Sequence, residues 1–345
     1  MPLEFGHFPP LNVESAFMPK HAPAVSIVGA GRTGRALGRA LRQRGWRIGA
    51  VITRSQKTAR AAVRAIGAGR PQSRLDTTAL NADVVLITTP DRSIASVATE
   101  LARQAVGEAR TKVRGNQRRF VGRGFNRDLK VGRSARLQPL ALGLFGAHPG
   151  SSSRNLLAKT TILHTNGALD RSVLAPLEHL GAATGSLHPL QTFTPHAAPN
   201  LDGAICAIEG TPRALRMARR IARDLGCIPV VLAPKSKPAY HAAAAMAAGH
   251  ILAVTEAATQ ILIALGFTRR QAVHALLPLT RQTLQNFESA WADPSAAWTG
   301  PLARRDFATV KKHAAALRKF PREYRDAYAA LSRLALLVLR QRTRK

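Results

Sequence analysis

Lys237 and His241 are the residues whose types and spacing best suit proton transfer. Four residues apart, they share one face of a helix. Pro238 is tolerated only in a first turn, so the helix is predicted to start at Lys237, with Ser236 as its N-cap. The positive helix end and partial burial would lower the lysine pKa toward the range useful for acid–base catalysis. The same pair also fits an exposed lysine beside a histidine that satisfies the core.

Two further pairs of polar residues follow predicted strands and could bind substrate. His188 and Gln191 lie in "SLHPLQTF", and His164 and Asn166 lie in "LHTNGAL". Either pair could hold a carboxylate or carbonyl oxygen, or could hydrogen-bond locally. The two cysteines are too far apart for a CxxC motif or a metal knuckle, and no metal site is expected.

A glycine motif precedes these residues by more than a hundred positions. The six residues are Gly29, Ala30, Gly31, Arg32, Thr33 and Gly34, in the G-x-G-x-x-G pattern. A buried strand, "AVSIV", precedes the motif and a helix follows it, which is the context that a dinucleotide site requires. The first glycine permits a tight turn, the second lets the backbone approach a pyrophosphate, and the third lets helix and strand pack closely.

The end of the next strand indicates which dinucleotide binds. A carboxylate there would suit NAD, whereas this chain has Arg54, Ser55 and Lys57. Arg54 could grip a 2′-phosphate with its planar fork, and Ser55 could donate a hydrogen bond to it. NADP is therefore predicted over NAD, unless Arg54 is only one more basic surface residue. Thr89 and Pro90 end a third strand at the edge where the nicotinamide half should lie.

Strands and helices alternate up to Pro234, and only helical patterns follow it. The predicted class is α/β, a doubly wound Rossmann-type parallel sheet followed by an all-helical C-terminal domain. Residues 1–22 are expected to form a disordered arm, 23–234 the dinucleotide-binding domain and 235–345 a helical substrate and dimerisation domain. Met18 is an alternative start to Met1.

The chain has 345 residues, a formal net charge of +32 and 46% hydrophobic residues, which indicates a globular basic protein. Residues 106–154 lack a folding pattern and are interpreted as a basic insertion. This segment could be a mobile surface loop, an arm that binds RNA or another polyanion, or a translated frameshift. Because the basic residues are spread along the chain and aromatic residues make up only 5%, nucleic acid is otherwise not expected.

The apolar stretch from Ala239 to Phe267 is long enough to raise the question of a membrane span. His241, His250 and Glu256 interrupt it, so a buried helix is predicted instead. With no secretory signal and no disulfide framework, a cytoplasmic location is expected.

Several motifs together resemble a known bacterial family. They are "GAGRTGRALGRAL", "HTNGAL", "GSLHPLQTF", "AIEG", "KPAYHAAAAM" and "TGPLARRD". These look like the proteins that join a Rossmann-like domain to domain of unknown function 2520, which are similar to the 6-phosphogluconate-dehydrogenase-like superfamily. The resemblance covers nearly everything from Ala24 to Leu317 except the basic insertion.

The resemblance implies a dinucleotide-dependent reductase and a homodimer formed through the long apolar helix. Several superfamily members carry a K-x-x-x-N pair, in which the lysine is the general acid or base and the asparagine orients substrate. Lys237 matches that lysine and His241 stands where the asparagine would be. Asn166 replaces the serine of the usual HTSGA, and Ala248 and Gly249 replace a usual Ser-Asn pair. The second departure puts the usual specificity, or activity itself, in doubt.

Two functions therefore remain open. The first is an NADP-dependent oxidoreductase that passes hydride between the nicotinamide and the carbonyl or imine carbon of a small, carboxylated substrate. The second is a non-catalytic NAD(P)-binding sensor or partner-binding protein. Polyanion binding through the insertion is compatible with either.

Overall fold

The structure is a computed structural model that describes residues 22–121, 156–194 and 199–341. The chain divides into two compact units, the first ending at Ala244 and the second beginning at Ala245. The predicted N-terminal arm and most of the predicted basic insertion lie outside the described residues.

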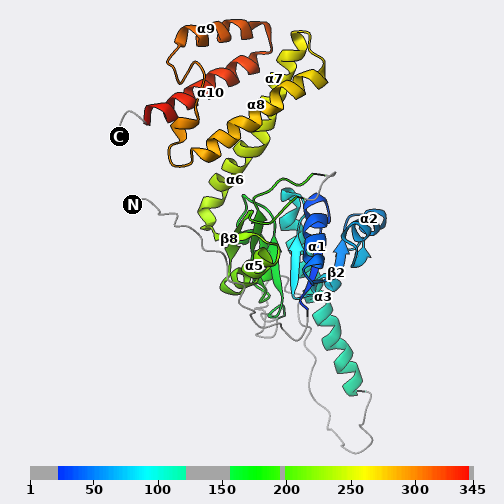
Figure 1. Cartoon of the computed structure of the whole chain (residues 1–345). Helices are drawn as coiled ribbons and strands as arrows, with labels where there is room; N and C mark the ends of the chain where they lie inside the picture. Colours follow the sequence, from blue (N-terminus) through cyan, green and yellow to red (C-terminus); the bar gives the residue numbers. More distant parts are fainter. Residues whose placement is uncertain (1–21, 122–155, 195–198, 342–345) are drawn as a thin grey trace, which may run out of the picture. The chain divides into compact units, whose positions relative to one another are not determined.

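The first unit is built on one eight-stranded sheet with the order β3-β2-β1-β4-β5-β6-β7-β8 (Figure 1). All neighbouring strands are parallel except β6 and β7, which pair antiparallel. The strands are β1 (Ala24–Val28), β2 (Arg47–Ile52), β3 (Arg70–Gln72), β4 (Val84–Ile87), β5 (Thr161–His164), β6 (Ala183–Pro189), β7 (Ile205–Gly210) and β8 (Ile228–Val231).

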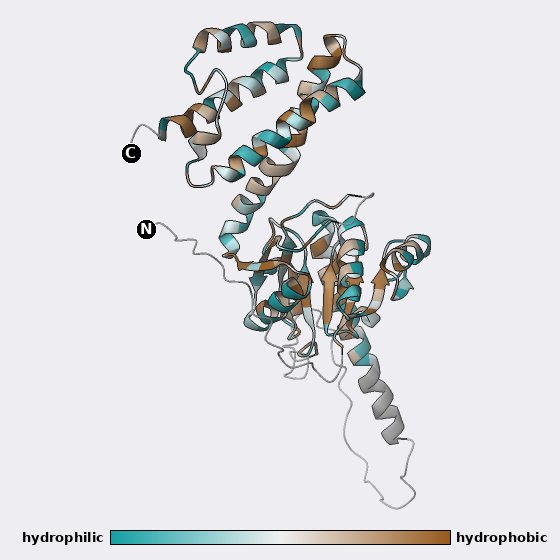
Figure 2. Ribbon diagram, in the orientation of Figure 1, coloured by the Kyte–Doolittle hydropathy of each residue, from teal (hydrophilic) through white to brown (hydrophobic). Residues whose placement is uncertain are grey.

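Helices cover both faces of this sheet, as the doubly wound class predicts. One face carries α1 (Arg32–Gln43), α2 (Gln56–Ile66) and α5 (Pro212–Asp224), whose buried residues pack against Val25, Ile27 and Leu187. The other face carries α3 (Ile94–Val121) and the short α4 (Ala175–Glu178). The strands between these layers are mostly hydrophobic (Figure 2). Because β1, β4, β5 and β6 run parallel, their carboxyl ends lie at one edge of the sheet.

The second unit is helical, as predicted. It contains a π-helical turn (Met246–His250), α7 (Ile251–Ala264), α8 (Arg269–Ser289), α9 (Phe307–Ala316) and α10 (Arg322–Gln341). A capping box formed by Thr268 and Gln271 starts α8. The side-chain oxygen of Asp306 accepts from Thr309 N and starts α9.

Three local expectations are wrong. Ser236 is not an N-cap, because it lies in a 3-10 turn (Pro234–Ser236) that precedes α6 (Lys237–Ala245) and has Ala233 at its cap. Helix α3 continues through Val121, so the first part of the predicted irregular insertion is helical. The long apolar stretch is not buried within the chain, since Thr259 is its only buried residue between Ala239 and Phe267.

The apolar stretch also belongs to a segment with membrane-like length and composition. The segment Pro234–Ala264 has 31 residues. Its most apolar 18 residues have a mean hydropathy of 1.3, and 6% of these 18 residues are buried. This match is weak evidence of a membrane span, because core helices of soluble proteins and signal sequences pass the same test.

Candidate dinucleotide and active site

The glycine-rich turn joins β1 to α1 at the carboxyl edge of the sheet. Gly29 has φ of 91°, and a Cβ placed there would lie 2.5 Å from Cγ2 of Thr89. A Cβ on Gly34 would lie 2.4 Å from Oγ1 of Thr88. Gly29 therefore needs both its left-handed backbone and its missing side chain, and Gly34 lets α1 pack against β4.

The start of α1 is open to an anionic ligand. A Cβ on Gly31 would have no neighbour closer than Gly29 O at 3.9 Å, and no side chain caps the helix. Arg32 is exposed and Thr33 half-buried in the first turn. Free backbone N–H groups at a positive helix end suit a pyrophosphate, so this turn fits a dinucleotide. Thr89 Oγ1, at the end of β4, is buried without a hydrogen-bond partner in the described part of the chain.

The end of β2 presents basic side chains next to this turn. Arg54 and Lys57 are exposed and form no ion pair with any residue that the structure describes. Ser55 is the N-cap of α2, and its Oγ accepts a hydrogen bond from Thr58 N at 3.2 Å. Two cations that pair with no described residue are thus available to a phosphate.

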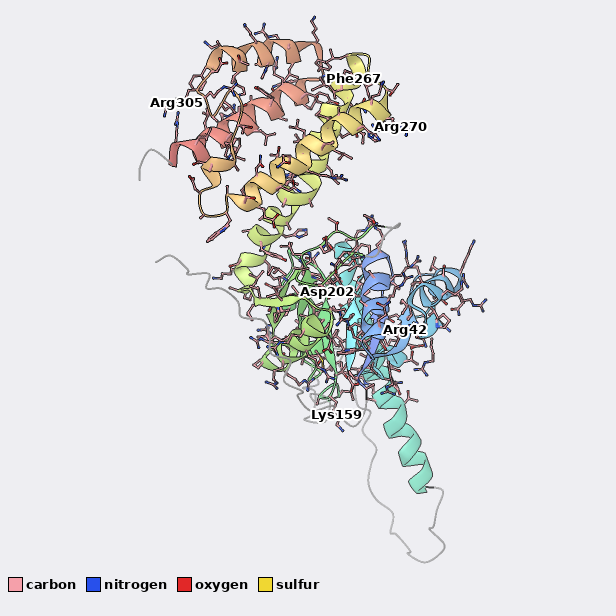
Figure 3. The ribbon with its side chains drawn as sticks, in the orientation of Figure 1. Arg42, Lys159, Asp202, Phe267, Arg270 and Arg305 are labelled. Atoms are coloured by element: carbon pink, nitrogen blue, oxygen red, sulfur yellow. The ribbon has the colours of Figure 1, made fainter. Side chains whose placement is uncertain are left out.

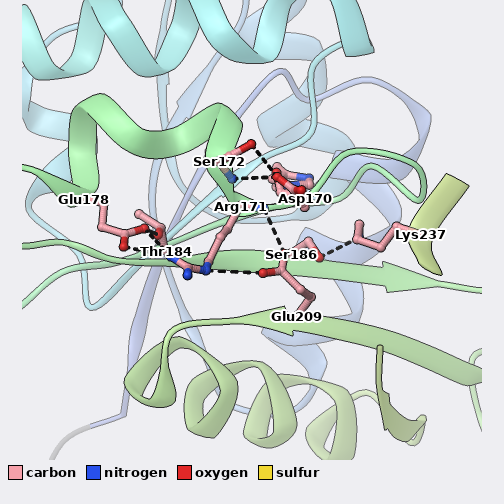
Figure 4. Close-up of polar contacts among 9 residues, drawn as sticks. Asp170, Arg171, Ser172, Glu178, Thr184, Ser186, Glu209 and Lys237 are labelled. Atoms are coloured by element: carbon pink, nitrogen blue, oxygen red, sulfur yellow. Dashed lines mark hydrogen bonds and ion pairs between the residues drawn. The ribbon is translucent and has the colours of Figure 1, made fainter. Parts of the chain in front are cut away.

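Lys237 is the largest fully buried side chain among the described residues, with 0% exposure. Its Nζ donates to Ser186 Oγ at 2.7 Å (Figure 4) and to Asn166 O at 3.3 Å. Ser186 lies on β6 and Asn166 follows β5, so the lysine ties α6 to the carboxyl edge of the sheet. An ammonium has three N–H donors, and the third has no partner among the described residues.

A buried carboxylate lies beneath Lys237. Glu209 on β7 is opposite Ser186 in the strand register and is 3% exposed. Its carboxylate accepts from the backbone N of Arg171 at 2.8 Å and pairs with Arg171 Nε at 3.4 Å (Figure 4). Burial raises the pKa of Glu209 and lowers that of Lys237, while the charge of Glu209 opposes the lysine shift.

His188, Tyr240 and His241 form a cluster above Gly167. The Tyr240 hydroxyl lies 3.0 Å from His188 Nδ1, and the two imidazole rings are 5.6 Å apart in an edge-to-face arrangement. A Cβ on Gly167 would lie 2.5 Å from His241 Nδ1 and 2.9 Å from His188 Nε2. Only glycine therefore lets both rings pack against this loop. His241 Nδ1 is buried and has no hydrogen-bond partner in the described ranges.

The other predicted substrate-binding residues are used by their own loops. His164 Nε2 lies 3.1 Å from Asp170 O, and its Nδ1 accepts from Asn166 N at 3.2 Å. Burial lowers the pKa of His164 to about 4, so the ring is neutral. Gln191 is exposed and donates to Asn200 O at 3.1 Å. The side chain of Asn166 caps the next turn, accepting from Ala168 N at 2.7 Å.

Four residues of this site were not predicted: Ser186, Glu209, Tyr240 and Gly167. The sequence could have predicted Ser186, because alternate residues of a strand share a face and His188 is two positions further on. Tyr240 is three residues after Lys237 and so on a neighbouring part of the helix face. Glu209 and Gly167 lacked a comparable signal.

The doubly wound sheet and the open glycine-rich turn define a dinucleotide-binding protein of the Rossmann type. Comparison with known families agrees. The family model described as "NADP oxidoreductase coenzyme F420-dependent" matches residues 24–109. The model of domain of unknown function 2520 matches residues 204–335. The two matches show that the chain joins a Rossmann-like domain of the NADP oxidoreductase type to domain of unknown function 2520.

Solved structures share the fold at low sequence identity. A protein from Bacteroides fragilis, provisionally described as an NADP oxidoreductase, has a TM-score of 0.63 at 18% identity, covering 91% of this chain and 98% of its own. A protein from Thermotoga maritima has a TM-score of 0.59 at 20% identity, covering 92% and 99%. A reductive aminase from Aspergillus terreus, in complex with NADPH, has a TM-score of 0.57 at 15% identity, covering 92% and 94%. No curated protein matches the chain.

Proposed function

We propose that the chain is an NADP-dependent reductase that acts on the carbonyl or imine carbon of a small, carboxylated substrate. The observation that carries this proposal is Lys237. It is a buried amine at the carboxyl edge of the sheet, with one donor that has no partner among the described residues after Ser186 and Asn166 take two. A desolvated lysine with a lowered pKa suits proton transfer near neutral pH.

Each residue of the site then has a defined task. NADPH would supply the hydride when bound, held by the glycine-rich turn, by Arg54 and by the residues that end β4. Lys237 gives the proton, Ser186 and Asn166 hold its Nζ, and His188 with His241 orients the oxygen or nitrogen of the substrate. The reductive aminase complex with NADPH is a fold neighbour in which the same class of cofactor binds.

The preference for NADP is tested by thermal shifts with NADPH and with NADH. We expect NADPH to stabilise the protein more than NADH, because Arg54 and Lys57 offer a 2′-phosphate two cations without counter-charges. Arg54→Ala should remove most of the difference, which corresponds to a roughly tenfold loss of NADPH affinity for one charge-assisted contact.

Arg60→Ala is the matched control, since Arg60 is also an exposed arginine of this region but lies within α2. Equal stabilisation by both cofactors, unchanged in Arg54→Ala, would contradict the NADP assignment.

A second candidate function is a non-catalytic sensor that binds the dinucleotide. The complete burial of Lys237 favours it, because an ammonium with 0% exposure and two internal hydrogen bonds also describes a purely structural residue. Ala248 and Gly249 stand where the family that the sequence resembles usually has a Ser-Asn pair, and they point the same way. This candidate predicts NADPH binding without turnover of any 2-keto acid or cyclic imine.

We also propose that the chain forms a homodimer through its helical unit. Only four described residues of this unit are buried, namely Thr259, Ala272, Ser295 and Ala335. Large apolar side chains are exposed on α7, on α8 and at the turn between them, where Phe267 is labelled in Figure 3. Leu252 is 69% and Leu279 64% exposed. A unit with so small a core requires a partner surface.

Light scattering after size exclusion should give twice the 37.0 kDa mass of the chain. Leu252→Glu combined with Leu279→Glu should raise the dimer dissociation constant at least tenfold, about 1.4 kcal/mol, by placing charges in an apolar interface. Gln285→Glu on α8 adds a similar charge at a polar position and should leave the mass unchanged. A monomer mass for the unaltered chain at all concentrations would contradict the proposal.

A further inference from the structure

Tyr240 contacts His188, and this contact bears on which nitrogen of the His188 ring carries its proton. His188 is the last residue but one of β6, and Tyr240 lies in the first turns of α6. Their polar atoms are 3.0 Å apart, and their rings are 5.6 Å apart at 87°. Both residues belong to the first unit, so the pair is part of one compact structure.

His188 is a neutral imidazole. Burial lowers its pKa to about 4, the charges of His241 and Lys237 add to this shift, and Asp91 opposes it. A neutral imidazole carries its proton on one nitrogen only, and the other nitrogen is an acceptor. If the partner of Nδ1 donates to it, Nδ1 is the acceptor and Nε2 carries the proton. If that partner accepts, Nδ1 carries the proton.

Tyr240 keeps its proton, because burial raises its pKa to about 12. The structure shows no other hydrogen bond for this hydroxyl among the described residues. A buried phenol without another acceptor donates to the available lone pair, which here is His188 Nδ1. The proton of His188 is then on Nε2. That nitrogen forms no hydrogen bond in the described part of the chain and lies beside Gly167.

We propose that Tyr240 is a positioning residue that holds His188 as the Nε2–H tautomer, a neutral donor that selects a carbonyl oxygen over a protonated imine. A carbonyl oxygen has lone pairs that accept from Nε2–H. A protonated imine nitrogen has none and would meet a second N–H donor. This inference rests on the proposed function and narrows its substrate class to carbonyl compounds.

The tautomer is measured without any substrate, by two-bond nitrogen–proton correlation spectra of the imidazole rings near neutral pH. We expect the Nε2–H pattern for His188, assigned by its loss in His188→Asn. In Tyr240→Phe the pattern should change to a mixture of tautomers, because Nδ1 loses its donor. An Nδ1–H pattern in the unaltered protein would overturn the proposal.

The chain offers a matched control pair in its helical unit. His313 Nδ1 lies 2.9 Å from the Tyr328 hydroxyl in an exposed setting. Tyr328→Phe removes the same hydroxyl from the same kind of pair, and it should leave the His188 signal unchanged. A change of the His188 signal in Tyr328→Phe equal to that in Tyr240→Phe would contradict a local effect.

Turnover with NADPH of small 2-keto acids and of cyclic imines tests the substrate class. We expect kcat/KM for the keto acids to exceed that for the imines, and Tyr240→Phe to reduce the keto-acid value about tenfold, as for one hydrogen bond. Faster turnover of imines, or equal losses for both classes, would overturn the assignment. Absence of all turnover would refute the proposed function and the substrate class, while the spectra would still decide the tautomer.

Discussion

Lys237→Met should lower kcat/KM for NADPH-dependent reduction by about 10² to 10⁴, the range for loss of a general acid. Methionine has a similar length and keeps the packing of the buried stem, but it has no proton to give. NADPH binding should be unchanged, because the glycine-rich turn and Arg54 lie at other strands of the sheet. The measurement is steady-state turnover of the active keto acid or imine, with a thermal shift by NADPH as the binding control.

The unfolding temperatures of Lys237 variants test whether this lysine is catalytic or only structural. A buried ammonium carries a desolvation cost of about several kcal/mol, and an apolar residue of similar volume removes that cost together with the two hydrogen bonds of Nζ. We therefore expect Lys237→Met to unfold at the same temperature as the unaltered protein or higher, whereas Lys237→Ala leaves a cavity and costs about 2–5 kcal/mol. Activity that survives in Lys237→Met would refute the proton-transfer role.

The pH dependence follows from the shifted lysine pKa. Proton donation in the reductive direction needs the ammonium form, so activity is present below the Lys237 pKa and lost as pH rises through it. Because burial lowers this pKa, the alkaline loss should occur below the ordinary lysine range. In Lys237→Met that alkaline limb should disappear from the residual activity.

Gly167→Ala is expected to damage the site more than its size suggests. The new Cβ would lie 2.5 Å from His241 Nδ1 and 2.9 Å from the His188 ring, distances that force at least one imidazole to move. Overpacking of this kind costs about 1–3 kcal/mol of stability. Displacement of substrate-orienting groups by about 1 Å can cost about 10²-fold in turnover. Chemical denaturation and steady-state kinetics measure the two effects.

Gly107→Ala is the control for this substitution. Gly107 lies within α3, and a Cβ there would meet no atom of a described residue within 4 Å. Helix propensity alone should make this variant more stable by about 0.5–1 kcal/mol, with unchanged turnover. If Gly167→Ala were as active and as stable as Gly107→Ala, the two imidazoles would not depend on this close packing.

The cations between β2 and α2 and the Thr89 hydroxyl after β4, none of which has a partner in the described ranges, belong to the same edge as the lysine cluster. In the proposed function Arg54 would hold one end of a bound dinucleotide, and Thr89 lies where the turn of Gly29 brings the chain close to β4. The proposed reductase thus uses adjacent strand ends for cofactor, proton donor and substrate orientation, which is the general location of ligands in open α/β sheets.

The sequence alone determined the elements and the glycine-rich turn. Strand and helix periodicity, the G-x-G-x-x-G spacing and the position of Pro238 are local properties, because each depends on backbone conformations within a few residues. The spacing of Lys237 and His241, which puts them on one helix face, is another such local property. Strand and helix periodicity also separated the α/β part from the helical part.

Only the tertiary structure decided which side chains meet. Lys237 contacts Asn166 and Ser186 across 71 and 51 positions of sequence, and His188 meets Tyr240 across 52. Such contacts depend on strand order and register, which place β5, β6 and the start of α6 together. The same register placed Glu209 opposite Ser186, and hydrogen bonds within their own loops occupy the side chains of His164 and Gln191. Local patterns specify what each segment becomes, whereas long-range pairing selects the partners, because it alone sets which segments share an edge.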